Sequence, residues 1–218
     1  ELVFSAKRRD GYDGPIAIRT EGLPPGLSLS DSVTIEAGQF RAFATIHADE
    51  KFAGVTEEEA KKVQVIASAE VNGATVEKEL GTLGKLEKGP DAKIMIEIAP
   101  DGSHGRPDED GVLTFTIAPG ETITARVLAK RLGFKERIDF GKEDSGRNLP
   151  HGVYVDNIGL NGLMIPVGKS EQRFSLTAAN WVPDTEREFH LRTTADQKQT
   201  TVPVRIRVRS EKGVASTQ

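Results

Sequence analysis

The acidic loop between residues 101 and 111 carries the residue types that bind calcium. Four carboxylates, Asp101, Asp108, Glu109 and Asp110, stand there among glycines. Carboxylate oxygens are the ligands that Ca²⁺ prefers, in sets of about six to eight. Their spacing does not follow the EF-hand series, and no glutamate stands where that series needs one. We therefore expect a solvated connection between two strands, with calcium binding at these four residues as the alternative.

A second loop, residues 156–162, could meet a ligand or an ion. Asp156, Asn157 and Asn161 supply side-chain oxygens, and the loop's glycines permit backbone conformations that expose carbonyl groups. The apolar Ile158 and Leu160 favour a different interpretation, in which the loop folds back onto its own domain. We expect the structural role and keep the ligand contact as the alternative.

Signatures of catalysis are missing from the sequence. The chain has no cysteine, so thiol chemistry and thiolate metal sites are excluded. It contains no Gly-x-Ser-x-Gly elbow, no Gly-rich phosphate loop and no pair of its four histidines at a metal-ligand spacing. Function has to be argued from a site, so we predict no catalytic residues, no cofactor and no enzymatic activity.

The basic and aromatic residues suggest surface contacts at most. Arg205, Arg207 and Arg209 alternate on one strand face, where they could meet an anionic polysaccharide. Charged residues on an edge strand also deter aggregation, which is the structural alternative. With a net charge of −4, binding to nucleic acid is not expected. Trp181 is the one tryptophan, and we expect it to close the edge of its domain.

A short sequence motif occurs twice in the chain. Leu23-Pro24-Pro25-Gly26 returns as Leu149-Pro150-His151-Gly152, and Ala6-Lys7-Arg8 returns as Ala129-Lys130-Arg131. Internal similarity of this kind, at offsets of 149 − 23 = 126 and 129 − 6 = 123 residues, indicates repeated structural units. The sequence therefore predicts two related domains.

Alternating apolar and polar residues run through both predicted domains. The stretches 40–48, 172–178 and 202–208 each place apolar side chains on one face, as half-buried strands do. Asn72-Gly73 between apolar residues is a hairpin signal, and only residues 56–62 have a helical pattern, with Thr56 and Glu59 spaced as a capping box. Many short strands predict an all-β chain of two tandem immunoglobulin-like or fibronectin-III-like β-sandwich domains.

The polar stretch around Gly89-Pro90 sets the predicted boundary. We place the first domain at residues 1–88, the second at 91–210 and a flexible tail at 211–218. The second domain has a segment, 91–120, ahead of its repeated part that the first lacks. The first domain should therefore lack its opening strand, with an edge at residues 2–9 open to strand addition. On this interpretation the chain belongs to a longer protein.

The residues 148–163, from Asn148-Leu149-Pro150-His151-Gly152 to Leu163, resemble a motif of large secreted bacterial proteins. Those proteins carry tandem immunoglobulin-like modules, often beside pre-peptidase C-terminal domains. The stretch 22–26 with Val33-Thr34-Ile35 is similar to a shorter version, and it also resembles modules that follow the catalytic domains of some glycosidases.

The resemblance implies a non-catalytic, extracytoplasmic module, secreted, periplasmic or on the cell surface. We expect a spacer or interaction segment of a larger exported bacterial protein, whose partners are the other domains of that polypeptide and extracellular polysaccharide or protein. Two alternatives stay open: a carbohydrate- or surface-binding accessory module, and the non-catalytic part of a secreted protease or glycosidase. No apolar run reaches the ~20 residues needed to span a bilayer.

Overall fold

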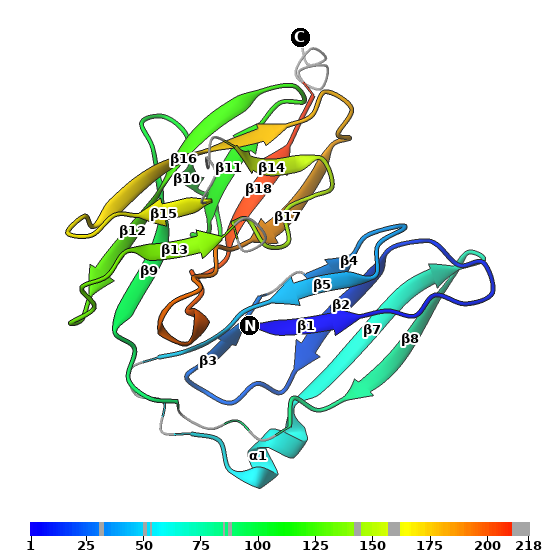
Figure 1. Ribbon diagram of the computed structural model, residues 1–218. Coiled ribbons are helices and arrows are strands. Elements are labelled where there is room, and N and C mark those ends of the chain that lie inside the picture. Colours follow the sequence, from blue (N-terminus) through cyan, green and yellow to red (C-terminus); the bar gives the residue numbers. More distant parts are fainter. Residues whose placement is uncertain are drawn as a thin grey trace. The chain divides into compact units, whose positions relative to one another are not determined.

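The computed structural model describes residues 1–30, 33–49, 52, 54–84, 86, 89–141, 145–156 and 162–210. The fold is built almost entirely of strands, which confirms the prediction of an all-β chain (Figure 1). The chain divides into two compact units, residues 1–90 and 91–218. The predicted tail, 211–218, lies outside the described residues. Within the described part, no helix has the length and apolar character to cross a membrane.

Unit 1 holds eight strands and one short helix among its described residues. Its elements are β1 (Leu2–Ser5), β2 (Ile16–Glu21), β3 (Leu27–Leu29), β4 (Val33–Ile35), β5 (Arg41–Ala44), β6 (Ile46–Ala48), α1 (Glu57–Lys62), β7 (Gln64–Val71) and β8 (Ala74–Gly81). The sheets are β4-β2-β7-β8, β1-β5 and β3-β6, and all of their pairs are antiparallel.

The core of unit 1 lies between these sheets because alternate residues of their strands are apolar. Ile18, Val33 and Val65 come from the four-stranded sheet, and Ala42 and Ala44 from β5; all five are buried. This arrangement fits a β-sandwich.

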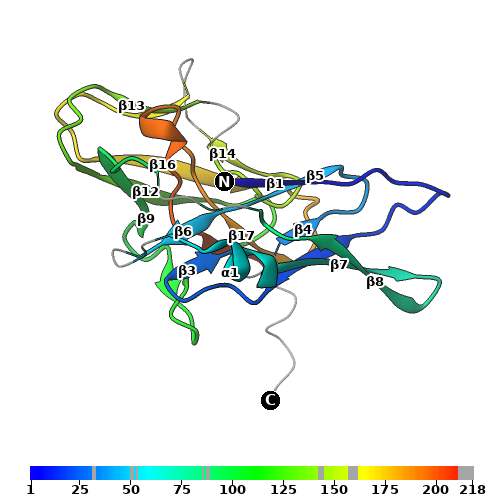
Figure 2. The ribbon, with the colours of Figure 1, turned by 90° about the horizontal axis from the view of Figure 1, so that it is seen from below.

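Two local predictions for unit 1 are confirmed. Thr56 caps α1, since its hydroxyl accepts from the Glu59 backbone N–H while the Glu59 carboxylate accepts from the Thr56 N–H. The Asn72-Gly73 turn joins β7 to β8, with positive φ at both residues as a tight hairpin requires. In Figure 2, β7 and β8 run side by side to this turn.

Unit 2 holds ten strands among its described residues. Its elements are β9 (Ile94–Pro100), β10 (Arg106–Pro107), β11 (Leu113–Ile117), β12 (Thr122–Arg131), β13 (Ile138–Gly141), β14 (Val153–Asp156), β15 (Leu163–Ile165), β16 (Glu171–Ala178), β17 (Thr185–Phe189), the 3₁₀ turn η1 (Asp196–Lys198) and β18 (Val204–Val208). The sheets are β14-β16-β12-β9, β10-β11-β18-β17 and β13-β15.

The two larger sheets enclose the core of unit 2. Ile96, Val127 and Leu176 face inward from one sheet, and Phe115 and Ile206 from the other. Strand β11 runs parallel to β18, whereas the other strand pairs in the unit are antiparallel. The segment 91–120, which the sequence places ahead of the repeated part, therefore supplies β9 to one sheet and β10 and β11 to the other.

The last strand of unit 2 is not the edge strand that the alternating arginines suggested as the structural alternative. Strand β18 lies between β11 and β17, so it is paired on both sides. Pro203 has no ladder role, because the strand begins at Val204. Pairing starts after the proline, which has no backbone N–H to donate to a ladder.

Candidate functional site

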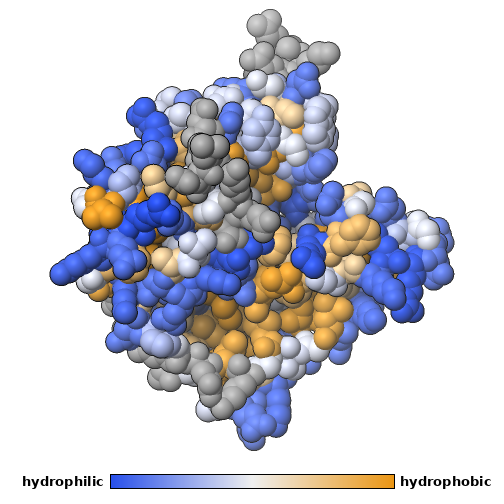
Figure 3. Space-filling model, in the orientation of Figure 1, coloured by the Kyte–Doolittle hydropathy of each residue, from blue (hydrophilic) through white to orange (hydrophobic). Residues whose placement is uncertain are grey.

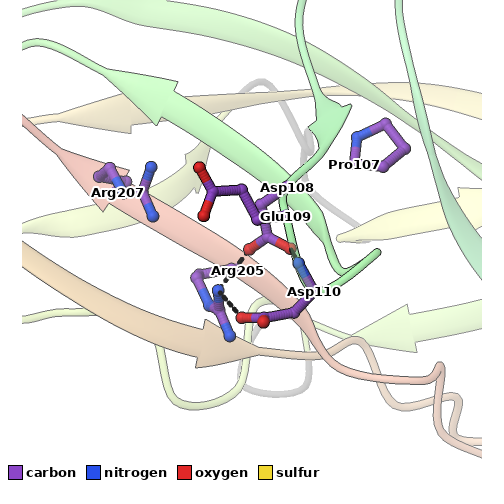
Figure 4. A pocket seen from close by; sticks show the side chains of 6 residues that line it. All are labelled: Pro107, Asp108, Glu109, Asp110, Arg205 and Arg207. Atoms are coloured by element: carbon purple, nitrogen blue, oxygen red, sulfur yellow. Dashed lines mark hydrogen bonds and ion pairs between the residues drawn. The ribbon is translucent and has the colours of Figure 1, made fainter.

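An ion-pair cluster, formed by the acidic loop and β18, is a polar site of unit 2. The site is an open depression of about 650 Å³ lined by Pro107, Asp108, Glu109, Asp110, Arg205 and Arg207 (Figure 4). The turn after β10 brings the carboxylates to this place, and the outward face of β18 supplies the arginines.

Asp108 organises the turn. Its Oδ1 accepts from the backbone N–H groups of Asp110 (3.1 Å) and Val112 (3.0 Å), and its Oδ2 accepts from the Thr114 hydroxyl (3.0 Å). The same Oδ2 accepts a hydrogen bond from Arg205. The Asp108 carboxylate is therefore committed to holding the turn and to neutralising an arginine.

Glu186 on β17 joins Arg205 and Arg207 of β18 and Arg209, which follows that strand. Its carboxylate lies 3.5 Å from Nε of Arg205, 2.5 Å from Nε of Arg207 and 3.5 Å from an Nη of Arg209. With Asp108 and Asp110 on the other side of Arg205, this face carries both signs of charge at close range. It is not the cationic stripe that the sequence alone suggests.

The electrostatics keep these groups ionised. The hydrogen bond from Arg207 is the main reason why the pKa of Glu186 lies below its ordinary value, and the pKa of Arg207 is raised in return. Burial alone would raise the pKa of Asp108, but the hydrogen bonds from Thr114 and Val112 and the charge of Arg205 together hold it below its usual value.

The four calcium candidates do not converge on one point. Asp101 pairs with Arg173 at 2.9 Å, and its pKa is lowered chiefly by a hydrogen bond with Thr124. Asp108 and Asp110 turn to Arg205 instead, and Glu109 lines the depression. Within the described ranges, no group of three or more His, Asp or Glu side chains could hold a metal ion.

The second predicted loop is described only at its first and last positions. Asp156 ends β14 and accepts a hydrogen bond from the Thr177 hydroxyl at 3.4 Å. Asn157 and Asn161 lie outside the described residues. The ligand role proposed for this loop stays a prediction.

Trp181 lies over the turn of the repeated Leu-Pro-x-Gly text. Its ring centroid is 5.2 Å from that of His151, and a Cβ added at Gly152 would come within 2.5 Å of the indole. The residue stays 57% exposed. We expected Trp181 to close the edge of its domain. In the structure, the indole packs beside His151 and leaves a flat aromatic surface exposed to solvent.

Two arginines whose role the sequence did not reveal anchor loops in the two units. Arg8 donates to the carbonyls of Gly14, Glu36 and Gln39. Arg131 donates to the carbonyls of Phe134, Glu136, Pro166 and Lys169. The sequence signal that could have identified them is the repeated Ala-Lys-Arg. Arginine at equivalent positions indicates a shared role, because a guanidinium can donate to several fixed acceptors at once and lysine cannot.

A comparison with protein-family models gives no match, and a comparison with curated proteins gives none either.

Proposed function

We propose that this chain is a non-catalytic spacer and interaction segment of a larger exported bacterial protein, made of two tandem immunoglobulin-like modules. The observation that carries the proposal is the matching hydrogen bonding of the two units. The Arg8 and Arg131 contacts correspond pairwise, with Nε bonded to Gln39 in one unit and Lys169 in the other. One Nη in each unit bonds to the first residue of the same turn, Glu36 or Pro166.

Backbone bonds around the Leu-Pro-x-Gly text correspond in the same way. Asp49 donates to the Gly26 carbonyl at 2.9 Å, and Ala179 donates to the Gly152 carbonyl at 2.9 Å. Both glycines have φ in the left-handed region, at 83° and 88°. Matching backbone geometry at matching sequence positions is what duplication of one module would leave behind.

The absence of a catalytic role is supported by how the charged side chains are used. Asp108 and Glu186 form ion pairs with Arg205, Arg207 and Arg209, and Asp108 also accepts hydrogen bonds from backbone N–H groups. Groups committed in this way stabilise a turn and a sheet face. Structural ion-pair networks of this kind shift pKa values without serving a reaction.

Force spectroscopy on the full chain tests the spacer role. Two independent modules give two unfolding events, with contour lengths near ~3.5 Å per residue of each unit. A single event would contradict the tandem arrangement.

Fractionation of the source cells, with an antibody to the chain, tests export. A cytoplasmic location would contradict export. Turnover of ester, peptide or glycoside substrates would contradict the non-catalytic assignment.

Carbohydrate binding by unit 2 is the second candidate, and the exposed Trp181 favours it. A flat ring held over Gly152 and next to His151 is a surface on which a sugar ring can stack. Because Trp181 is the only tryptophan, its fluorescence reports on this place alone. Titration with soluble polysaccharides should shift the emission of the native chain, and an unchanged spectrum at millimolar sugar would exclude the candidate.

A further inference from the structure

We infer that the outer edge of β1 in unit 1 is a docking site for an additional β-strand. The inference rests on the proposed equivalence of the two units. The occupant is an extended stretch with the alternating apolar pattern of β9, and we place it before β1 in the polypeptide because β9 precedes β12. Docking would add one antiparallel strand to β1 by backbone hydrogen bonds.

The first observation is the unpaired edge itself. Within the described residues, β1 pairs with β5 and with no other strand. The Ala6 N–H donates to the Phe40 carbonyl, so the backbone groups of the even-numbered residues point to β5. Because successive residues of a strand point their backbone groups to opposite sides, those of Val3, Ser5 and Lys7 point away from β5.

The second observation is that the corresponding edge is filled in unit 2. The Ala129 N–H donates to the Ser170 carbonyl at 2.7 Å, as that of Ala6 does to Phe40 at 3.0 Å. The other edge of β12 pairs with β9 from Arg131 to Ala125. Asp196 fixes the start of β9, because its Oδ2 accepts from the backbone N–H groups of Lys93 (2.6 Å) and Ile94 (2.9 Å).

The third observation is a difference in burial between equivalent side chains. In β12, the inward residues Ala125 and Val127 are fully buried and Ala129 is 6% exposed. Their counterparts Leu2, Phe4 and Ala6 are only partly buried. Figure 3 shows apolar side chains gathered over β1, β3 and β5. The apolar face of β1 thus lacks the cover that Ile94, Ile96 and Ile98 give to β12.

Strand β8 repeats this difference on the opposite sheet. In unit 2, Val204, Ile206 and Val208 of β18 are buried, and β11 lies along that strand in parallel. In unit 1, β8 is the last strand of its sheet, and Val76 and Leu80 are 50% and 49% exposed. A stretch that continued from a β9-like strand into a β11-like strand would cover both β1 and β8, as residues 94–117 do in unit 2.

The repeat offset of 131 − 8 = 123 fixes the register of the docked strand. In unit 2, Leu128 lies opposite Glu97. The counterpart of Leu128 is Ser5 (128 − 123 = 5), so the occupant's residue equivalent to Glu97 should lie opposite Ser5. Apolar residues equivalent to Ile96 and Ile98 should then face Ala6 and Phe4.

A cross-linking experiment tests the site and its register together. The chain has no cysteine, so Ser5→Cys introduces a single thiol. The probe is a synthetic peptide with the sequence of residues 91–101 and cysteine in place of Glu97. Opposed residues of a hydrogen-bonded pair have Cα atoms ~5.5 Å apart, which a disulfide can bridge. We expect Ser5→Cys to cross-link several-fold faster than Val3→Cys or Lys7→Cys, and equal rates would overturn the register.

Hydrogen exchange on the full chain tests docking without a cross-link. The unmodified peptide should slow exchange at the amides of Val3, Ser5 and Lys7 by at least about tenfold. A control peptide with threonine in place of its three isoleucines should not. Ser5→Pro, which removes one outward N–H, should abolish the protection, whereas Ser5→Ala should keep it. Unchanged exchange at these amides in the native chain at saturating peptide concentration would overturn the proposal.

The remaining occupant, a second copy of the chain, is distinguished by analytical ultracentrifugation. A concentration-dependent dimer that Ser5→Pro dissociates would assign the edge to self-association and overturn the assignment to a preceding strand. Circular dichroism melts of each variant verify that it is folded. Failure of strand docking leaves the two unfolding events under force unaffected, so the failure of this inference is distinguishable from failure of the spacer proposal.

Discussion

Arg8 and Arg131 each bind several backbone carbonyls with one guanidinium, in different units of the chain. The side chain of Arg8 is only 8% exposed, and it connects the end of the β1 segment to the loops at Gly14 and Glu36. Arg131 connects the end of β12 to the loops at Glu136 and Pro166. In unit 1, the loop that follows β1 is thereby tied to the turn that precedes its partner strand, β5. In unit 2, the loop that follows β12 is tied in the same way to the turn that precedes its partner, β16.

Replacing these arginines by lysine should destabilise each unit. Lysine is a single point donor and cannot reach acceptors on two loops at once, so carbonyls lose their partners. We expect Arg131→Lys to lower the free energy of unfolding by about 1–3 kcal/mol in urea titrations. Arg9→Lys, at the exposed position next to Arg8 in unit 1, is the control for an arginine-to-lysine exchange and should change little. Equal stability of both variants would contradict the anchoring role.

The stability of unit 2 should depend on pH through Asp108. The pKa of this carboxyl is lower in the folded state than in the unfolded chain, so its ionised form stabilises the fold. That stabilisation is complete above the unfolded value of about 4 and is lost as the pH falls through the folded value. Asp108→Asn should therefore be less stable than the native chain at pH 7. At acidic pH, where Asp108 is protonated, the two free energies of unfolding should approach each other.

Urea titrations between neutral and acidic pH measure this dependence. Asp156→Asn is a useful comparison, because its carboxylate ends a strand and accepts a hydrogen bond from the Thr177 hydroxyl. Asp156→Asn should keep the pH dependence of stability that the native chain has. If Asp108→Asn kept it as well, the Asp108–Arg205 pair would not be the cause of that dependence.

Asp196 should hold the start of β9 in place. Its carboxylate accepts from two backbone N–H groups at the beginning of the strand. Asp196→Ala removes both acceptors and should cost about 0.5–2 kcal/mol, as the loss of a helix cap does. Asp196→Asn keeps an oxygen acceptor and tolerates the positive φ of 43°, so it serves as the matched control. Faster amide exchange at Lys93 and Ile94 in Asp196→Ala alone is the expected readout.

Gly152 should tolerate substitution less well than Gly168. Both have positive φ, at 88° and 73°, so alanine at either strains the backbone. Only at Gly152 would the new Cβ also come within 2.5 Å of Trp181, whereas nothing lies within 4 Å at Gly168. We expect about 1–2 kcal/mol for Gly168→Ala and more for Gly152→Ala, together with a change in tryptophan emission. Equal costs would show that the indole moves aside freely.

Calcium should leave the melting temperature unchanged. Asp101 and Asp108 are each neutralised by an arginine, so calcium would have to displace a charged partner to bind them. A specific ion stabilises the folded state by mass action, so differential scanning fluorimetry in millimolar CaCl₂ is a direct measurement. NaCl of equal ionic strength controls for screening. A saturable rise in the melting temperature would contradict this prediction and would support calcium binding by the acidic loop.

The sequence predicts the fold better than it predicts the polar site, for physical reasons. Alternation and turn chemistry are local, so the Asn72-Gly73 hairpin and the Thr56 cap could be identified from neighbouring residues. The Asp108–Arg205 pair joins positions 97 residues apart, and only the parallel pairing of β11 with β18 brings them together. The arginines of β18 therefore looked like a free cationic face until their acidic partners from β17 and the loop were placed.

The repeated text was informative in a further way. It identified Arg8 and Arg131 as equivalent positions, although only the coordinates reveal the carbonyls that they bind. Glu186 had no signal in the sequence, because a single glutamate on an alternating strand is indistinguishable from any solvated residue. Its role depends on the neighbouring strand.

The parallel pairing of β11 with β18 has a consequence for synthesis of the protein. Thr114 lies opposite Arg205, so their contact closes a loop of 205 − 114 = 91 residues. During translation, β11 must wait beside a nascent sheet until nearly the whole of unit 2 has left the ribosome, whereas β7 and β8 can pair as soon as they emerge. Contacts so distant in sequence slow folding. Unit 2 should therefore be the slower of the two to mature, and the one that depends more on protection by chaperones while β11 is unpaired.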